Sequence, residues 1–206
     1  MRAMATILIA TSNQGKLRDF AAAAAAHGIE VAGLPQFSTL PGVAEDQPSF
    51  EGNAAKKAMY YSRFAPGEVV LADDSGLEVQ ALQGAPGVHS ARYAATSPQE
   101  NASDAANNAR LLAELQAVPE EERQAKFVCV IVAAQDGRTL ASFRGEARGI
   151  LLHAQRGSGG FGYDPLFFFP ALGKTFAELS PDEKARVSHR GQAFRKFLVW
   201  METGSQ

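Results

Sequence analysis

The chain has 206 residues, of which 46% are hydrophobic and 20% are charged. These proportions are typical of one globular domain or two packed lobes, and they exclude a disordered or fibrous chain. With 20 basic and 22 acidic residues the formal net charge is −2. No overall positive field is available to hold a nucleic acid, so an anionic ligand has to meet a local basic cluster.

The lengths of the apolar stretches and the single cysteine predict the cellular location of the protein. No apolar stretch approaches the roughly 18 residues that cross a bilayer, and the start of the chain resembles a strand rather than a signal peptide. The one cysteine, Cys129, has no partner for an internal disulfide and lies in an apolar run typical of a core strand. We therefore expect a cytoplasmic protein that contacts neither membrane nor nucleic acid.

Hydrophobic periodicity predicts a mixed α/β fold. Strands are expected at 7–10, 29–32, 69–72, 126–135 and 139–147, with an Asp136-Gly137 hairpin turn between the last two. Helices are expected at 16–27 and 53–64, from Ser97 to about Leu115, and twice after Ser180. The apolar stripe of the final helix is Ala193, Phe194, Phe197, Leu198 and Met201. We expect a single domain over 1–206.

Two polar clusters flank the first predicted helices. The segment 11–16 follows a strand and opens a helix, and its hydroxyls, amides and lysine could surround a phosphate, or else be an N-cap and a solvated lysine. Its residues are Thr11, Ser12, Asn13, Gln14, Gly15 and Lys16. The second cluster, Glu45-Asp46 followed by Asn53 and Lys56-Lys57, is by itself an ordinary charged loop and helix face.

Asp73 and Asp74 follow a continuous apolar strand, and we expect them at its carboxyl end, where open α/β sheets bind ligands. Adjacent carboxylates repel unless a cation or a hydrogen-bond donor offsets their charge. Their hard oxygens suit Mg²⁺, which is often shared with substrate phosphates. The alternative is a solvated turn or a capping pair.

A fourth cluster is glycine-rich. Gly157–Gly162 has the spacing of a dinucleotide fingerprint, but Pro165 follows where that motif requires a helix. Glycines also let the backbone approach a ligand closely, and aromatic and basic residues nearby offer stacking faces and donors for a base. These residues are Phe161, Tyr163, Lys184, His189 and Arg190. Together the four clusters are typical of a metal-dependent nucleotide hydrolase.

Five strings, in order over nearly the whole chain, resemble the inosine/xanthosine triphosphate pyrophosphatase family. They are 11–16 (TSNQGK), 72–77 (ADDSGL), 84–93 (GAPGVHSARY), 161–165 (FGYDP) and 188–191 (SHRG). The resemblance implies a two-lobed α/β fold with a mixed sheet, flanking helices and a central cleft. It also implies a homodimer and Mg²⁺-dependent hydrolysis of ITP, dITP and XTP to the nucleoside monophosphate and pyrophosphate.

The resemblance also implies roles for individual residues. Residues 11–16 and Lys57 would bind the triphosphate, Asp74 would be the general base, and Asp74 with Glu45 would hold the metal. The nucleoside would be held by Ser75, Phe161, Gly162, Tyr163, Asp164, Lys184, His189 and Arg190. The chain departs from the family pattern at Gly52, where a glutamate is common, and at Asp46-Gln47, where a Thr-Gly pair is common.

Base choice has a chemical rationale. A 6-keto purine presents an acceptor where adenine presents a donor, so N–H groups of Arg190 or His189 would favour hypoxanthine and xanthine. Guanine has the same 6-keto group, so this rationale does not separate GTP. Two alternatives stay open: a pyrophosphatase for another damaged or pyrimidine nucleotide, and a nucleotide-binding regulator without turnover.

Overall fold

The computed structural model describes residues 6–97 and 100–204. The chain divides into two compact units. Unit 1 comprises Met1–Asp74, Cys129–Glu146 and Ala185–Gln206, and unit 2 comprises Ser75–Val128 and Ala147–Lys184.

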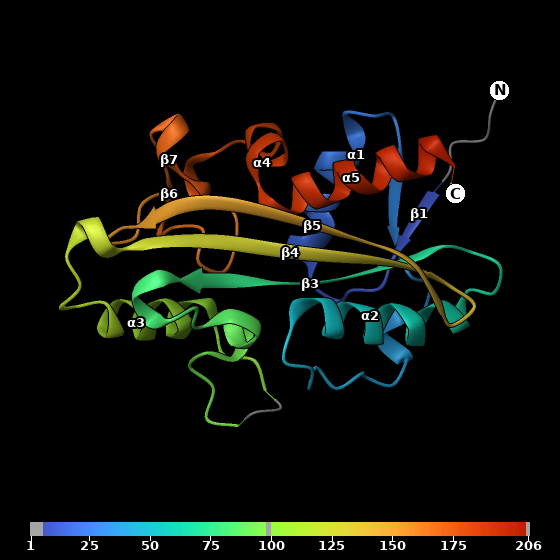
Figure 1. Cartoon of the computed structure of the whole chain (residues 1–206), viewed down its shortest axis with the longest axis horizontal. Coiled ribbons are helices and arrows are strands. Elements are labelled where there is room, and N and C mark those ends of the chain that lie inside the picture. Colours follow the sequence, from blue (N-terminus) through green and yellow to red (C-terminus); the bar gives the residue numbers. More distant parts are fainter. Residues whose placement is uncertain (1–5, 98–99, 205–206) are drawn as a thin grey trace. The chain divides into compact units, whose positions relative to one another are not determined.

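Strands and helices alternate along much of the chain (Figure 1). The strands are β1 (Thr6–Ile9), β2 (Glu30–Gly33), β3 (Val70–Val79), β4 (Gln124–Gln135), β5 (Arg138–Leu151), β6 (Phe167–Phe169) and β7 (Lys174–Thr175). The helices are α1 (Gln14–Ala25), α2 (Phe50–Tyr61), α3 (Asp104–Glu114), α4 (Pro181–Val187) and α5 (His189–Thr203). The predicted mixed α/β class is confirmed.

The strands form a mixed sheet in the order β2-β1-β3-β4-β5-β6-β7. β1 pairs in parallel with β2 and with β3, while β6 pairs antiparallel with β5 and β7. β4 and β5 are joined by the predicted turn, in which Asp136 and Gly137 both have positive φ angles, 50° and 81°. That conformation matches the twist of a two-residue hairpin, which explains the glycine at its second position.

The core of unit 1 lies between its strands and the pair α1 and α5, with α2 on the opposite face (Figure 1). Phe20 of α1 and Phe194 of α5 pack with ring centroids 5.7 Å apart. Cys129 is fully buried in this core, as predicted. The predicted stripe of α5 is wrong at Met201, which is 44% exposed, because in the last turn of the helix Trp200 is the residue that packs against the core.

The core of unit 2 is aromatic. Phe127 of β4 stacks on Phe176 with ring centroids 5.7 Å apart, and Phe167 of β6 packs against both rings. Beside them Arg123 is buried, and its guanidinium donates to four backbone carbonyls. These acceptors are Leu115 O, Val118 O, Leu151 O and Leu152 O.

Two predicted helix starts are wrong. α3 begins at Asp104 rather than after Ser97, because Ser103 is the N-cap and its side chain accepts from Ala106 N. Pro98 and Gln99, on which the earlier start rested, lie outside the described residues. α2 begins at Phe50 rather than Asn53, since the Ser49 side chain caps Gly52 N. The capping box predicted at Ser180 is confirmed, because Ser180 and Glu183 exchange side chain to backbone hydrogen bonds.

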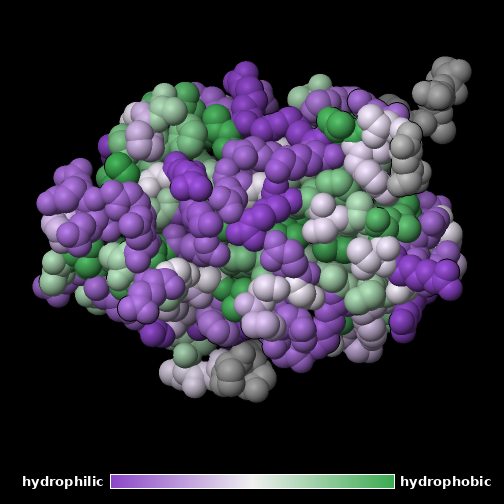
Figure 2. All heavy atoms as spheres, viewed as in Figure 1, coloured by the Kyte–Doolittle hydropathy of each residue, from purple (hydrophilic) through white to green (hydrophobic). Residues whose placement is uncertain are grey.

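Along the described ranges 6–97 and 100–204, none of the helices has the length and hydropathy needed to cross a bilayer. On the face shown in Figure 2, hydrophilic side chains separate the apolar ones into several small groups.

Candidate active site

Asp73 and Asp74 lie inside β3, which continues for five residues beyond Asp74 to Val79. The expectation that they end a strand is therefore wrong. Both side chains are buried, Asp73 at 2% and Asp74 at 5% residue exposure. A buried carboxylate is costly unless it is paired, so the strand can continue through them only because each has its own basic or amide partners.

The two carboxylates have different partners because successive residues of a strand point to opposite faces. Asp73 faces α1 and α5: its Oδ2 lies 3.0 Å from Lys16 Nζ and 3.8 Å from Arg190 Nη2. Arg190 is itself held by Asp19, whose Oδ2 is 2.6 Å from Arg190 Nη1. Burial alone would raise the pKa of Asp73, but Lys16 and Arg190 outweigh it and lower that pKa to about 2. Asp73 is therefore ionised at neutral pH.

Asp74 faces α2. Its Oδ2 accepts from Asn53 Nδ2 at 3.0 Å, and its Oδ1 lies 3.9 Å from Lys57 Nζ. Lys57 also contacts Glu45 Oε1, at 2.5 Å. Burial raises the pKa of Asp74 above its ordinary value, and the opposing effects of Lys57 and Lys16 are too small to cancel it. A carboxylate with a raised pKa is suited to accept a proton in catalysis.

The residues around Asp74 fit a divalent cation. Asp74 and Glu45 both approach the Lys57 ammonium, so two carboxylates face one region of positive charge. Hard carboxylate oxygens are the donors that Mg²⁺ prefers. On the opposite face of β3, the buried Asp73 Oδ1 has no hydrogen-bond partner within the described part of the chain, and it does not belong to this group of oxygens. Across residues 6–97 and 100–204, no three His, Cys, Asp or Glu side chains are already grouped as a metal site.

The segment 11–16 contains the start of α1. Asn13 is the N-cap, and its Oδ1 accepts from Lys16 N at 3.1 Å. The backbone N–H groups of the first turn are the donors that helix starts offer to anions. Asn13 caps the helix, as one of the two interpretations has it, whereas the Lys16 side chain is 15% exposed and paired with Asp73 rather than solvated. Phosphate binding by this segment stays a prediction.

Most of the predicted nucleoside residues belong to unit 2. Asp164 Oδ2 accepts from Phe161 N at 2.9 Å and from Lys184 Nζ at 2.6 Å. The Lys184 ammonium also lies 4.9 Å from the centroid of the Phe161 ring. Tyr163 is buried and donates from its hydroxyl to Ser90 O at 2.8 Å. Residues 161–164 thus form a tightly bonded loop, called the FGYD loop below.

The remaining predicted residues are placed as follows. Ser75 follows Asp74 in β3 and is half-buried in unit 2. His189 and Arg190 begin α5 in unit 1, where Ser188 Oγ caps the helix by accepting from Gly191 N at 3.1 Å. Arg190 is 2% exposed, and its Nη2 lies 3.8 Å from Asp73 Oδ2 within unit 1. A direct contact of His189 or Arg190 with a base stays a prediction.

Three residues that contact the predicted ones had no role assigned from the sequence, although Asn53 was part of the second polar cluster. Asn53 orients Asp74, Asp19 holds Arg190, and Asn108 of α3 donates to Gly162 O. Asn53 and Asn108 each lie on the buried face of an otherwise ordinary helix, and an unexpected amide there was the available signal. Asp19 carries no such signal, because its partner is 171 positions away.

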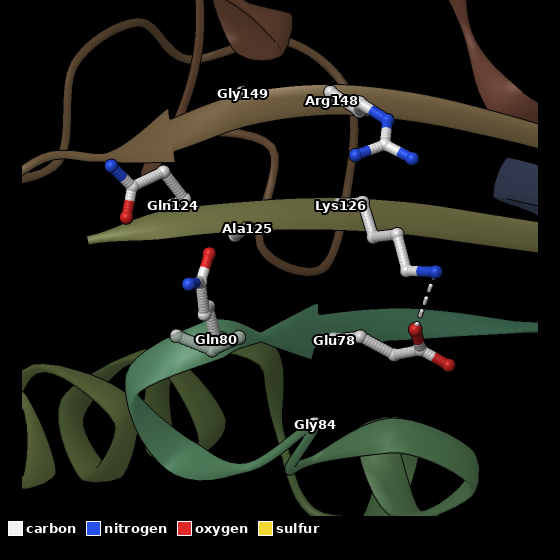
Figure 3. Close-up of a pocket in the computed structure, with 9 residues that line it drawn as sticks. Glu78, Gln80, Gly84, Gln124, Ala125, Lys126, Arg148 and Gly149 are labelled. Atoms are coloured by element: carbon white, nitrogen blue, oxygen red, sulfur yellow. Dashed lines mark ion pairs between the residues drawn. The ribbon is translucent and has the colours of Figure 1, made fainter. Parts of the chain in front are cut away.

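A pocket of about 370 Å³ lies in unit 2 and contains none of the predicted site residues. Figure 3 shows it across β3, β4 and β5, with Gln80, Gln124 and Arg148 around it. Glu78 and Lys126 form an ion pair of 3.0 Å at one end.

Comparisons with known proteins find relatives that match nearly the whole chain. The model of the Ham1 family matches residues 7–200. The dITP/XTP pyrophosphatase of Geobacillus kaustophilus is 50% identical over 193 residues, 94% of this chain and 92% of that protein. That of Geobacter sulfurreducens is also 50% identical, over 92% of this chain and 93% of that protein. The solved Ham1 protein of Staphylococcus aureus is 40% identical with a TM-score of 0.80, covering 97% of this chain and 99% of that one.

The two departures from the family pattern lie against each other. A Cβ added at Gly52 would meet Gln47 Cβ at 2.8 Å, which is closer than two carbons approach. A side chain at position 47 therefore requires a glycine at position 52. Asp46, in the same segment, pairs with Lys56 at 2.8 Å and leaves the Glu45–Lys57 contact intact.

Proposed function

Because this chain belongs to the Ham1 family, we propose that it is a nucleoside triphosphate pyrophosphatase acting on deaminated purine nucleotides. Its substrates are ITP, dITP and XTP, and its products are the nucleoside monophosphate and pyrophosphate. The observation that carries the proposal is Asp74, a buried carboxylate of raised pKa beside Lys57 and Glu45. Support also comes from relatives at 50% identity that are named dITP/XTP pyrophosphatases.

In this proposal the basic residues of unit 1 bind the triphosphate. Lys16 and Lys57 neutralise its negative charge. The start of α1 and the residues before it add backbone donors. These residues are Thr11, Ser12, Asn13, Gln14 and Gly15. Asp73 holds Lys16 in place and is itself kept ionised by Arg190. Each charge-assisted hydrogen bond to a phosphate oxygen stabilises the complex by roughly 1.5–3 kcal/mol.

Asp74 and Glu45 are the residues that would hold Mg²⁺. A bound Mg²⁺ supplies positive charge to the phosphates during bond cleavage. Two observations support this assignment. Both side chains offer carboxylate oxygens, and both lie close to the positively charged Lys57 ammonium.

Asp74 is the general base. Asn53 fixes one of its oxygens, Oδ2, so that Oδ1 is oriented to take a proton from water. The water oxygen forms a bond to the α-phosphorus, the bond from that phosphorus to the bridging oxygen breaks, and pyrophosphate leaves with the bond electrons. Lys16 and Lys57 stabilise the charge that grows on the leaving group. No covalent intermediate on the protein is required.

The FGYD loop and Lys184 hold the nucleoside, with Ser75 beside Asp74 in the strand. Phe161 offers a ring face, and the space beside the Cα of Gly162 is open because no atom lies within 4 Å of the place that a Cβ would take. The 6-keto oxygen of a deaminated purine accepts hydrogen bonds from N–H donors, whereas the amino group of adenine would leave those donors unpaired. We also propose a homodimeric, cytoplasmic enzyme, as the family resemblance and the single cysteine suggest.

Pyrophosphate release from ITP, dITP, XTP, GTP and ATP in the presence of Mg²⁺ tests the proposal. We expect ITP and XTP to be cleaved and ATP to be at least a hundredfold slower in kcat/KM. ATP cleaved as fast as ITP would refute the substrate assignment, and a preference for a pyrimidine nucleotide would favour the alternative pyrophosphatase. Binding without release would favour a non-hydrolysing regulator.

Asp74→Asn tests the base, with Asp182→Asn, an exposed carboxylate of α4, as the matched control. We expect turnover to fall at least a thousandfold in the first variant and to stay within twofold in the second. A folded Asp74→Asn protein that retains turnover would remove Asp74 from the mechanism.

A further inference from the structure

We propose that α3 sets the geometry of base binding, with Asp104 and Asn108 as positioning residues that hold the FGYD loop. The inference rests on the proposed function, because it assumes that this loop holds the nucleoside. All of the residues concerned lie in unit 2.

Asp104 and Asn108 both hydrogen-bond to the backbone of Gly162. Asp104 Oδ2 accepts from Gly162 N at 2.6 Å, and Asn108 Nδ2 donates to Gly162 O at 2.9 Å. Asp104 and Asn108 are four residues apart, so they lie one above the other on the same face of α3. The N–H and the C=O of Gly162 are thereby both fixed by side chains of a single rigid helix.

The position of Gly162 determines where two aromatic rings point. Gly162 has φ +62°, a conformation that favours glycine, and it connects Phe161 to Tyr163. The peptide before it carries Phe161, whose ring faces Lys184, and the peptide after it carries Tyr163, whose hydroxyl is bound to Ser90 O. Fixing both peptide planes removes the rotations that would move the Phe161 ring from its base-binding position.

Asn108 is a buried amide, which lowers the stability of the fold unless its hydrogen bond to Gly162 compensates. It is 2% exposed, and its Oδ1 finds no hydrogen-bond donor in the described ranges 6–97 and 100–204. A leucine of similar size would remove that buried unpaired acceptor and add apolar burial. The leucine would also leave Gly162 O without its donor, so the hydrogen bond to the loop is what asparagine contributes at this position.

The experiment compares Asn108→Leu with Asp104→Ala and Asp104→Asn, using Ala109→Ser on the exposed face of α3 as the matched control. For each variant we would measure kcat and KM for ITP, and the inhibition constant of pyrophosphate. Pyrophosphate carries no nucleoside, so it reports on the phosphate-binding residues alone.

We expect Asn108→Leu and Asp104→Ala to raise KM for ITP about threefold to tenfold, with kcat within twofold and an unchanged inhibition constant for pyrophosphate. Asp104→Asn retains an acceptor oxygen and should restore most of the affinity. Ala109→Ser should match the unmodified enzyme.

An unchanged KM in Asn108→Leu and Asp104→Ala would overturn the inference. So would an equal weakening of ITP and pyrophosphate, because that pattern indicates general damage to the enzyme. If the unmodified protein does not hydrolyse ITP at all, the proposed function itself fails, and this result is distinct from an active enzyme whose variants behave normally.

Discussion

Asp73→Asn probes the buried charges that hold Lys16. The substitution keeps the shape of the side chain but removes the negative charge that faces Lys16 and Arg190. Asp73 has a pKa of about 2 in the folded protein and 3.8 as the reference value, a difference that corresponds to roughly 2 kcal/mol at ~1.36 kcal/mol per pH unit. For a chain of this size that is a drop in Tm of about 4–8 °C at neutral pH.

The pH dependence of this loss has a definite sign. A carboxyl with a lowered folded pKa stabilises the protein above its unfolded pKa, and the contribution disappears as the pH falls through the folded value. The difference in unfolding free energy between the unmodified protein and Asp73→Asn should therefore be full above about pH 4.5 and shrink towards zero between pH 4 and pH 2.

Urea unfolding followed by circular dichroism at several pH values measures that difference. Asp182→Asn, an exposed substitution, should change the unfolding free energy by less than about 0.5 kcal/mol at every pH. A difference for Asp73→Asn that does not change with pH, or a variant that is more stable at neutral pH, would refute the assignment of Asp73 as a charge stabilised by Lys16 and Arg190.

Three further predictions follow from burial. Because the pKa of Asp74 is raised by burial and a base must be unprotonated, kcat/KM for ITP should fall with decreasing pH in a limb centred above 3.8, and a pH–rate profile flat down to pH 4 would contradict this. Arg123→Met should lower the unfolding free energy by about 3 kcal/mol, since four carbonyls lose their donor, with Arg123→Lys recovering part of the loss in thermal melts. Cys129 is buried and its pKa is raised, so a thiol reagent should label it only under unfolding conditions, and rapid labelling of the native protein would show that the core opens.

Local sequence patterns predicted most of the elements. The Asp136-Gly137 turn, the apolar strands and the capping box at Ser180 depend on residues close in sequence, and the structure contains all of them. The helix start at Ser97 failed although Glu100 completes the capping pattern there, whereas Ser103, which does cap α3, has Ala106 at the corresponding position. The local pattern therefore did not identify the N-cap that the folded chain uses.

The sequence also predicted which residue types form the site, but it did not predict which of these side chains pair with one another. The pattern of two aspartates after an apolar run predicted a charged site, while the strand in fact continues and places Asp73 and Asp74 on opposite faces with separate partners. Electrostatic energy depends on distances in space, and the Asp19–Arg190 ion pair joins positions 171 residues apart. The residue types thus set the chemistry available to this protein, whereas the folded arrangement sets which charges neutralise each other and which carboxylate has a pKa suited to accept a proton.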